Sequence, residues 1–141
     1  MADATVQTVD LALTIGGREV VLIRRLNPPF QDRLCLPGGH VDPDDASLAH
    51  ACVREAAEEI HFSADPAALE ELCDLDAPDR DPRGPTISKV FHIDVECDPQ
   101  LSPDSDARVI VIASLRDLGP EAMGFDHWKA IEALRTRLGI V

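Results

Sequence analysis

Apolar residues in the first half of the chain show two different patterns of spacing. Residues 5–15 and 19–25 are near-continuous runs of aliphatic and β-branched side chains, which are typical of strands buried on both faces of a sheet. A Gly-Gly pair at 16–17 separates them and predicts a tight hairpin turn. After Ser47, an expected N-cap, apolar side chains recur at every fourth position. This spacing predicts a helix with one buried stripe, formed by Leu48, Cys52, Ala56 and Ile60.

The second half of the chain continues with strands and ends on a helix. Further strands are expected at 34–36, 86–96 and 107–114. Residues 68–76 fit either a strand or a helix, and the residues alone do not decide. The last helix is expected to begin at an Asp126 N-cap and to stop at Gly139. Its apolar stripe, which places Trp128 in the core, consists of Trp128, Ile131, Leu134 and Leu138.

Length and composition narrow the class of protein. A chain of 141 residues fits one domain, 1–141. Its 45% hydrophobic and 28% charged residues are those of an ordinary globular protein. No run approaches the ~18 apolar residues of a membrane span, and the N-terminus lacks the basic and apolar pattern of a secretion signal. We therefore expect a cytoplasmic protein without a membrane partner.

The net charge and the spacing of the cysteines argue against nucleic-acid-binding proteins, zinc ribbons and redox proteins. The net charge of −13 argues against nucleic acid as a partner, because binding to nucleic acid depends on Lys and Arg neutralising phosphates. The four cysteines have no paired spacing of the kind that zinc ribbons or redox motifs need. We interpret them as small buried side chains in a reducing compartment: Cys35, Cys52, Cys73 and Cys97.

The candidate chemistry lies where a glycine loop meets the first helix. Glu55, Glu58 and Glu59 fall within an arc of roughly 100° on that helix. Like charges this close weaken a helix, so either solvent or a bound cation must offset their repulsion. Mg²⁺ prefers oxygen ligands and suits clustered carboxylates beside phosphate. The alternative is a solvated acidic face, but the upstream Gly38-Gly39 favours a site, because glycine lets a carbonyl turn toward a metal.

Leu-Pro-Gly-Gly at 36–39 followed by Arg-Glu-Ala-Ala-Glu-Glu at 54–59 resembles the signature of the Nudix hydrolases. These enzymes cleave a diphosphate linked to another moiety. The chain departs from the family pattern at two places. The interval from Gly39 to Arg54 is one residue longer than usual, and the early glutamate of the pattern is replaced by Asp45 or Asp44. The glycine that usually follows the helix is His61, a residue type that also tolerates positive φ.

The resemblance implies a fold and a set of roles. The fold would be an α/β/α sandwich with a mixed sheet. Metal ligands would be the Gly38 carbonyl, Glu55, Glu58 and Glu59, with Mg²⁺ as the cofactor and Mn²⁺ as the alternative. Arg54 would orient the catalytic glutamates Glu55 and Glu58. The general base stays open between Glu55 and a carboxylate of the segment 94–106, namely Asp94, Glu96, Asp98 or Asp104.

Three further segments are similar to the Nudix branch that hydrolyses ADP-ribose: Arg-Arg-Leu-Asn-Pro-Pro-Phe at 24–30, Asp-Pro-Arg-Gly at 81–84 and Gly-Phe-Asp-His at 124–127. The likeness implies that a small nucleotide-derived substrate, ADP-ribose first, is cleaved to AMP and ribose 5-phosphate. It also implies a homodimer. The expected substrate-binding residues are Arg24, Arg25, Arg83 and Gly39.

Two alternatives remain in the same family. One is a hydrolase that removes unwanted nucleoside triphosphates. The other is a non-catalytic module that senses a nucleotide. The intact 54–59 motif favours catalysis over sensing, as does the end of the chain at Val141 without a basic segment. With only 4 Phe, 1 Trp and no Tyr, few rings are available to stack on a base.

Overall fold

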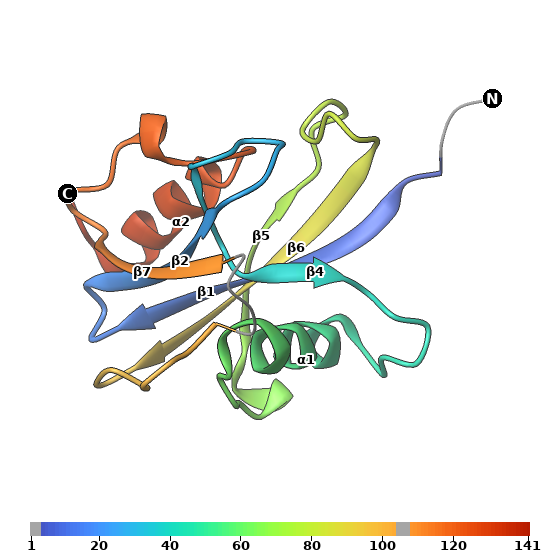
Figure 1. Ribbon diagram of the computed structural model, residues 1–141. Helices are drawn as coiled ribbons and strands as arrows, with labels where there is room; N and C mark the ends of the chain where they lie inside the picture. The colour runs from blue at the N-terminus through green and yellow to red at the C-terminus, as the bar shows by residue number, and fades with distance from the viewer. Residues whose placement is uncertain (1–3, 104–107) are drawn as a thin grey trace.

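The computed structural model describes residues 4–103 and 108–141, and Figure 1 shows how these residues are arranged. The regular elements are β1 (Val6–Ile15), β2 (Glu19–Arg25), β3 (Leu34–Cys35), β4 (Gly38–His40), α1 (Leu48–Ile60), β5 (Glu70–Leu75), β6 (Thr86–Val95), β7 (Arg108–Ser114) and α2 (Trp128–Leu138). Two short 3₁₀ helices, Pro66–Ala68 and Pro120–Ala122, complete them.

The strands in the described part of the chain form one mixed sheet of seven strands. Its main path runs β3-β2-β1-β6-β5, with β4 also paired to β1 and β7 to β2. β1 and β6 are parallel, and the other pairs are antiparallel. β1 pairs with β4 near its start, through residues 8–10, and with β2 at its end. Gly38 and Gly39, which the sequence predicted to lie in a loop, form part of strand β4, and the sheet places this glycine loop of the motif beside the first half of β1.

Side chains of β1 alternate between two cores, one on each face of the sheet. Leu11 and Leu13 belong to the cluster that contains Ile60 of α1, whereas Ala12 belongs to the cluster that contains Ile131 and Leu134 of α2. The two helices lie on opposite sides of the sheet (Figure 1). The predicted α/β/α sandwich with a mixed sheet is confirmed.

The predicted hairpin and first helix agree with the structure. Gly16 and Gly17 have φ values of 58° and 64°, which lie in the left-handed region that glycine enters without steric cost. The side chain of Ser47 accepts a hydrogen bond from the His50 N–H, as an N-cap does. The undecided segment 68–76 holds the strand β5 after a 3₁₀ turn. Residue 107, the expected start of the last strand, lies outside the described residues.

Two predictions are wrong. Asp126 does not cap α2: the N-cap position is His127, which makes no capping hydrogen bond, and the Asp126 carboxylate instead binds Arg80. A charge-assisted pair with a buried guanidinium is the stronger interaction. The cysteines are not all buried. Cys97 is exposed, because it follows the end of β6 in a loop beyond the core.

Trp128 packs against the α2 core cluster, as its spacing predicted. All four cysteines are free thiols; Cys35 and Cys52 are buried as predicted, whereas Cys73 in β5 is only half-buried. No helix within residues 4–103 and 108–141 is long and apolar enough to cross a membrane.

Candidate active site

Two glycines of β4 lie in tight contact with their neighbours: a side chain at Gly38 would meet the backbone of β1, and one at Gly39 would displace the Glu55 carboxylate. A Cβ on Gly38 would lie 2.2 Å from the Val9 carbonyl oxygen and 2.3 Å from Asp10 Oδ1. A Cβ on Gly39 would lie 2.4 Å from Glu55 Oε2. Their bare Cα atoms let β4 lie directly against β1 on one side and against a carboxylate of α1 on the other.

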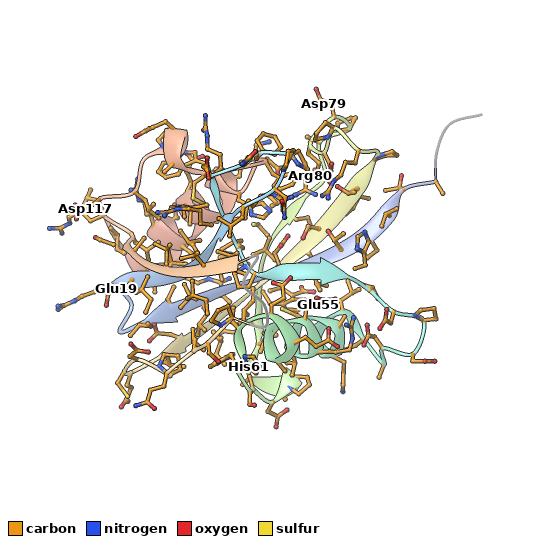
Figure 2. All side chains as sticks on the ribbon, in the orientation of Figure 1. Glu19, Glu55, His61, Asp79, Arg80 and Asp117 are labelled. Atoms are coloured by element: carbon orange, nitrogen blue, oxygen red, sulfur yellow. The ribbon has the colours of Figure 1, made fainter. Side chains whose placement is uncertain are left out.

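Two glutamates of α1 reach this glycine pair. Glu59 is only 8% exposed, and its Oε2 accepts a hydrogen bond of 3.1 Å from the Gly38 N–H. Glu55, one turn earlier, faces Gly39 and lies between α1 and β4 (Figure 2). Burial raises the pKa of Glu55, and the hydrogen bond and charge of Arg54 partly oppose that rise. The structure thus brings the glycine loop and two of the three motif glutamates together.

Arg54 orients the acidic groups around it. Its Nε and Nη2 donate to the two carboxylate oxygens of Asp45 at 3.0 and 2.9 Å. Its Nη1 donates to Glu55 at 3.1 Å and to Glu58 at 3.3 Å, and Nη2 also donates to the His40 carbonyl at 3.0 Å. The predicted pairing of Arg54 with Glu58 is present, although the Glu58 side chain is 58% exposed.

The structure separates the two candidates for the early acidic position. Asp45 takes the two-pronged contact with Arg54, and that contact holds the pKa of Asp45 below its usual value. Asp44 is exposed. Five residues separate Gly39 from Asp45, as in the family pattern, so the extra residue lies between Asp45 and Arg54.

The donor atoms at the glycine loop fit a hard cation. Among the described residues, no three His, Cys, Asp or Glu side chains already close around one metal position. Mg²⁺ does not need such a cage, since it keeps several waters and binds through one or two carboxylates plus substrate phosphate. Glu55 and Glu59 beside the Gly38 peptide supply oxygen donors of that kind. Ligation by Glu58 and by the Gly38 carbonyl stays a prediction.

A cleft of about 300 Å³ opens next to these groups. Gly38, Gly39 and Glu59 line one side of it, and Arg25 and Arg83 line another together with Phe125. Carboxylates that suit a metal and guanidiniums that suit phosphate therefore border the same space.

Phe125 is at the centre of the cationic side. The guanidinium carbon of Arg25 lies 5.2 Å from its ring centroid and that of Arg83 lies 5.6 Å away. The ring of Phe30 packs against it at 4.6 Å between centroids, tilted by 50°. Arg83 is also held by Asp81, whose carboxylate accepts from Arg83 Nη2 at 2.9 Å. These contacts form a wall of flat aromatic and guanidinium groups.

The two arginines that end β2 have different surroundings. Arg25 lines the cleft, and its Nε donates to the Pro29 carbonyl at 2.6 Å. Arg24 is exposed and is not among the residues that border this cleft. Consecutive residues of a strand point to opposite faces, so only one of the pair can face the site.

Buried polar groups form the floor of the cleft behind Gly38. Asp10 accepts a hydrogen bond from the Ser88 hydroxyl and lies 3.7 Å from His127 Nε2. The Leu36 N–H donates to His127 Nδ1 at 3.0 Å, which places the remaining ring proton on the Asp10 side when the imidazole is neutral. Burial lowers the pKa of His127 and so favours that neutral form.

The alternative general bases lie elsewhere. Asp94 accepts from the Thr14 hydroxyl at 2.7 Å and from the Gly17 N–H at 2.8 Å, so it holds the β1–β2 hairpin. Glu96 and Asp98 are exposed and do not border the described cleft. Asp104 falls outside the described residues. Of these alternatives and Glu55, only Glu55 lies against the glycine loop in the described structure.

Several cleft residues had no signal in their own spacing. Phe125 and His127 carry a signal only as part of the segment 124–127, and the sequence around Arg80 and Asp10 matches no motif of their own. Asp10 sits inside an apolar strand run, where a buried carboxylate costs stability unless it is paired or hydrogen-bonded. That unusual position was the one signal that could have identified it.

The fold and the glycine–glutamate arrangement agree with comparisons to known proteins. The family model described as NUDIX domain matches residues 5–134, so the chain belongs to the NUDIX family. An ADP-ribose pyrophosphatase of Methanocaldococcus jannaschii is 37% identical over 114 residues, which are 81% of this chain and 64% of that protein. The chain therefore spans less than two thirds of the length of this relative.

Solved structures give the same result. The NUDIX domain of Shewanella oneidensis NrtR, in complex with ADP ribose, is 27% identical with a TM-score of 0.82. The match covers 96% of this chain and 90% of that one. A bifunctional NMN adenylyltransferase/ADP ribose pyrophosphatase of Francisella tularensis, complexed with AMP and a manganese ion, is 27% identical with a TM-score of 0.76. That match covers 96% of this chain and 42% of the other. The resemblance to the ADP-ribose pyrophosphatase branch is confirmed.

Proposed function

We propose that the protein is a Mg²⁺-dependent hydrolase of nucleoside diphosphate derivatives, with ADP-ribose as first substrate and AMP and ribose 5-phosphate as products. The observation that carries the proposal is the two-sided cleft. One side offers Glu59 and the glycine loop, and the other offers Arg25, Arg83 and Phe125. The named activity of the archaeal relative and the ADP ribose bound to the NrtR domain support ADP-ribose as substrate.

The residues of α1 and the glycine loop would bind the metal ion and orient its ligands. Glu55 and Glu59 would hold the metal with the Gly38 carbonyl, and Glu58 would act directly or through water. When bound, Mg²⁺ or Mn²⁺ supplies neutralisation of the diphosphate and activation of water. Arg54 fixes the direction of Glu55 through its hydrogen bond.

The substrate would be held from the opposite side. Arg25 and Arg83 can donate to phosphate oxygens, since a guanidinium matches phosphate in two-pronged contacts. Phe125 offers a ring on which a base can stack. Gly39 has no side chain between the cleft and Glu55. The side chain of Glu55 can also accept a proton from attacking water, which makes it our choice of general base.

Ligand sensing is the second candidate, favoured by the similarity to the NrtR domain that binds ADP ribose. A sensor and a hydrolase would share the cleft and differ in turnover. Binding and cleavage must therefore be measured separately.

The test is a panel of dinucleotides, sugar nucleotides and nucleoside triphosphates, assayed with Mg²⁺ for product release and in EDTA by calorimetry for binding. We expect the highest kcat/KM for ADP-ribose. Binding of ADP-ribose without cleavage of any compound in the panel would contradict hydrolysis and favour sensing. Faster cleavage of a nucleoside triphosphate than of ADP-ribose would show that the triphosphate, and not ADP-ribose, is the preferred substrate.

The homodimer, the cytoplasmic location and the single domain over residues 1–141 stay predictions. Sedimentation of the purified chain, with and without ADP-ribose, tests the first of them. The expected mass is twice 15.3 kDa.

A further inference from the structure

The cationic side of the cleft combines Arg25 of β2 with two loop segments that are far apart in sequence. One is the loop 77–85, which carries Arg83, and the other is the segment 124–127, which carries Phe125. A wall built from two loops can hold a ligand only if the loops are fixed relative to each other. One buried arginine, Arg80, connects them.

We infer that Arg80 is a positioning residue: by binding Asp126 and Thr86 it holds Arg83 against Phe125 and so forms the wall on which the nucleobase of the substrate stacks. This inference rests on the proposed function, and it adds a residue that borders the cleft but acts on substrate affinity by holding Asp126 and Thr86.

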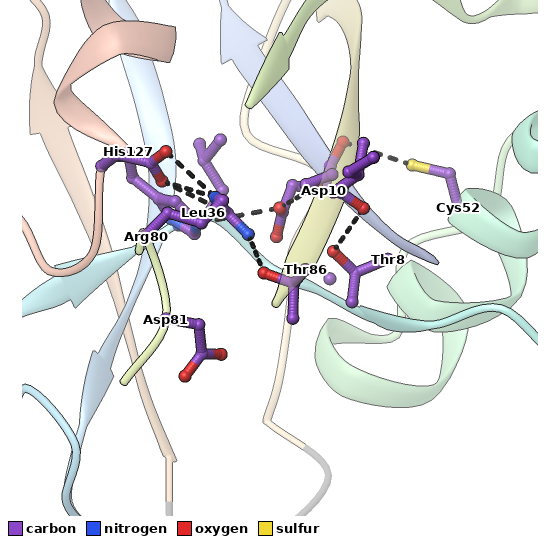
Figure 3. Close-up of polar contacts among 12 residues, drawn as sticks. Thr8, Asp10, Leu36, Cys52, Arg80, Asp81, Thr86 and His127 are labelled. Atoms are coloured by element: carbon purple, nitrogen blue, oxygen red, sulfur yellow. Dashed lines mark hydrogen bonds and ion pairs between the residues drawn. The ribbon is translucent and has the colours of Figure 1, made fainter. Parts of the chain in front are cut away.

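The geometry of Arg80 is that of a clamp. Its Nε lies 3.1 and 3.0 Å from the two carboxylate oxygens of Asp126, and its Nη2 donates to Oδ1 at 2.8 Å. Its Nη1 donates to the Thr86 hydroxyl at 2.7 Å, a contact drawn as a dashed line in Figure 3. The side chains of Arg80 and Asp126 are 4% and 13% exposed. Arg80 therefore joins the start of β6 and its preceding loop to the entry of α2.

The two residues of this contact are close in sequence to the two residues of the wall: Asp126 follows Phe125, and Arg80 precedes Arg83. Phe125 directly precedes Asp126, so the contact of Asp126 with Arg80 anchors the backbone next to the Phe125 ring. Arg83 follows Arg80 by three residues in the same turn-rich loop. The wall also gathers Phe30, so it uses two of the five aromatic residues of the chain.

The guanidinium of Arg80 binds Asp126 and Thr86. Those of Arg25 and Arg83 lie over the Phe125 ring at the cleft, while Arg83 also binds Asp81. Stacking on an aromatic ring contributes to binding for every kind of base, because each base has a π face. A loosened clamp should therefore weaken binding of the nucleotide part and leave the acidic helix, where the bond is cleaved, unchanged.

Arg135 offers a matched structural control. It also ties α2 to a loop, since its Nε donates to the Leu115 carbonyl at 2.7 Å and its Nη2 to the Leu118 carbonyl at 2.7 Å. It also stacks on a ring, that of Trp128, at 4.8 Å. None of these four residues borders the cleft formed by the described residues.

The experiment compares Arg80→Met, Arg80→Lys and Arg135→Met with the wild type in ADP-ribose kinetics with Mg²⁺, in calorimetric binding of AMP and ADP-ribose, and in thermal unfolding. We expect Arg80→Met to raise KM and both dissociation constants at least about tenfold, with kcat within about threefold. Arg80→Lys should not restore affinity, because an ammonium cannot make the forked contact. Arg135→Met should lower the melting temperature and leave KM unchanged.

The double variant Arg80→Met/Asp126→Asn separates positioning from stability. Removing both charges relieves the cost of an unpaired buried carboxylate, so the melting temperature should recover toward the wild type. KM should nevertheless stay raised, since the two loops are no longer joined. This variant also keeps the test decisive if Arg80→Met does not fold.

Three results would overturn the inference. They are wild-type KM in the double variant, a fall in kcat at constant KM, and equal effects of Arg80→Met and Arg135→Met on affinity. A wild type that binds ADP-ribose but cleaves nothing would overturn the proposed hydrolysis alone, because the dissociation constants still test the clamp. A wild type that neither binds nor cleaves would overturn both.

Discussion

Arg54 is surrounded by four carboxylates within 3.6 Å, those of Asp42, Asp45, Glu55 and Glu58. One guanidinium cannot neutralise four acids, so the surroundings of Arg54 keep an excess of negative charge that a divalent cation would offset. The two-pronged contact with Asp45 fixes the plane of the guanidinium. Fixing that plane also fixes the direction in which Arg54 meets Glu55.

Replacement of Asp45 tests this orienting role. Asp45→Asn loses one charged acceptor of the Arg54 fork, so Glu55 should lose its fixed direction and kcat should fall about tenfold or more. Asp44→Asn is the matched control, because the neighbouring side chain is exposed, and it should behave as the wild type. The measurement is steady-state hydrolysis of ADP-ribose. Equal activities of the two variants would refute the orienting role of Asp45.

At the scale of elements, the exit of α1 is built around His61. This residue has φ of 57° and ψ of 35°, the left-handed conformation in which glycine usually ends a helix. Its Nδ1 lies 2.7 Å from the Ser102 carbonyl oxygen, and the Ser102 N–H donates to the Ile60 carbonyl at 3.2 Å. The side chain thus attaches the loop after β6 to the end of α1, which a glycine could not do.

Two substitutions separate the roles of His61. His61→Ala keeps a Cβ in the left-handed region and loses the contact with Ser102, so it should lower the free energy of unfolding by about 1–2 kcal/mol. His61→Gly loses the same contact but relieves the backbone cost, so it should be the more stable of the two. Urea unfolding measures both. A glycine variant less stable than the alanine variant would show that the backbone conformation is not what matters here.

The sequence predicted those elements whose signals are local. The runs 5–15 and 19–25, the glycine turn between them and the four-residue spacing on α1 each depend on neighbouring residues only, and the structure agrees with them. Asp126 failed as a cap because Arg80, distant in sequence, takes its carboxylate. Segment 68–76 was undecided because its pairing with β6 is a tertiary contact.

The same distinction applies to the site. The glycine loop and the glutamates lie in two adjacent motifs, and their spacing was enough to bring them together. The wall of Phe125, Arg25 and Arg83 combines three segments whose approach depends on how the loops fold over the sheet. The pattern of a single sequence does not show that these segments come together. It therefore predicted Arg25 and Arg83 as substrate-binding residues but not that both contact the Phe125 ring.

At the scale of the whole molecule, unfolding should depend on pH through His127. Burial lowers its pKa, with Asp10 acting in the opposite direction, so the folded state resists a proton that the unfolded state takes up near the ordinary value of 6.5. The free energy of unfolding is therefore unaffected by protonation of His127 above pH 6.5. It falls as the pH decreases below 6.5, by up to about 1.4 kcal/mol per pH unit for one proton.

His127→Asn isolates this contribution. The amide oxygen can still accept from the Leu36 N–H, but the side chain cannot take up a proton near neutral pH. We expect the melting temperature of the variant to fall less steeply than that of the wild type between pH 7 and about 5. If the melting temperatures of the variant and the wild type fell equally steeply with decreasing pH, His127 would not be the titrating group.

The central claim is that one turn of α1 and the glycine loop hold a divalent cation, and a Mn²⁺ titration followed by electron paramagnetic resonance in the presence of AMP tests it most directly. Glu55→Gln and Glu59→Gln keep the size of the side chains, and Glu132→Gln on the exposed side of α2 is the control. We expect each of the first two variants to bind Mn²⁺ at least about tenfold more weakly than the wild type, since a neutral amide is a poor ligand for a hard cation. Wild-type affinity in both variants would contradict it.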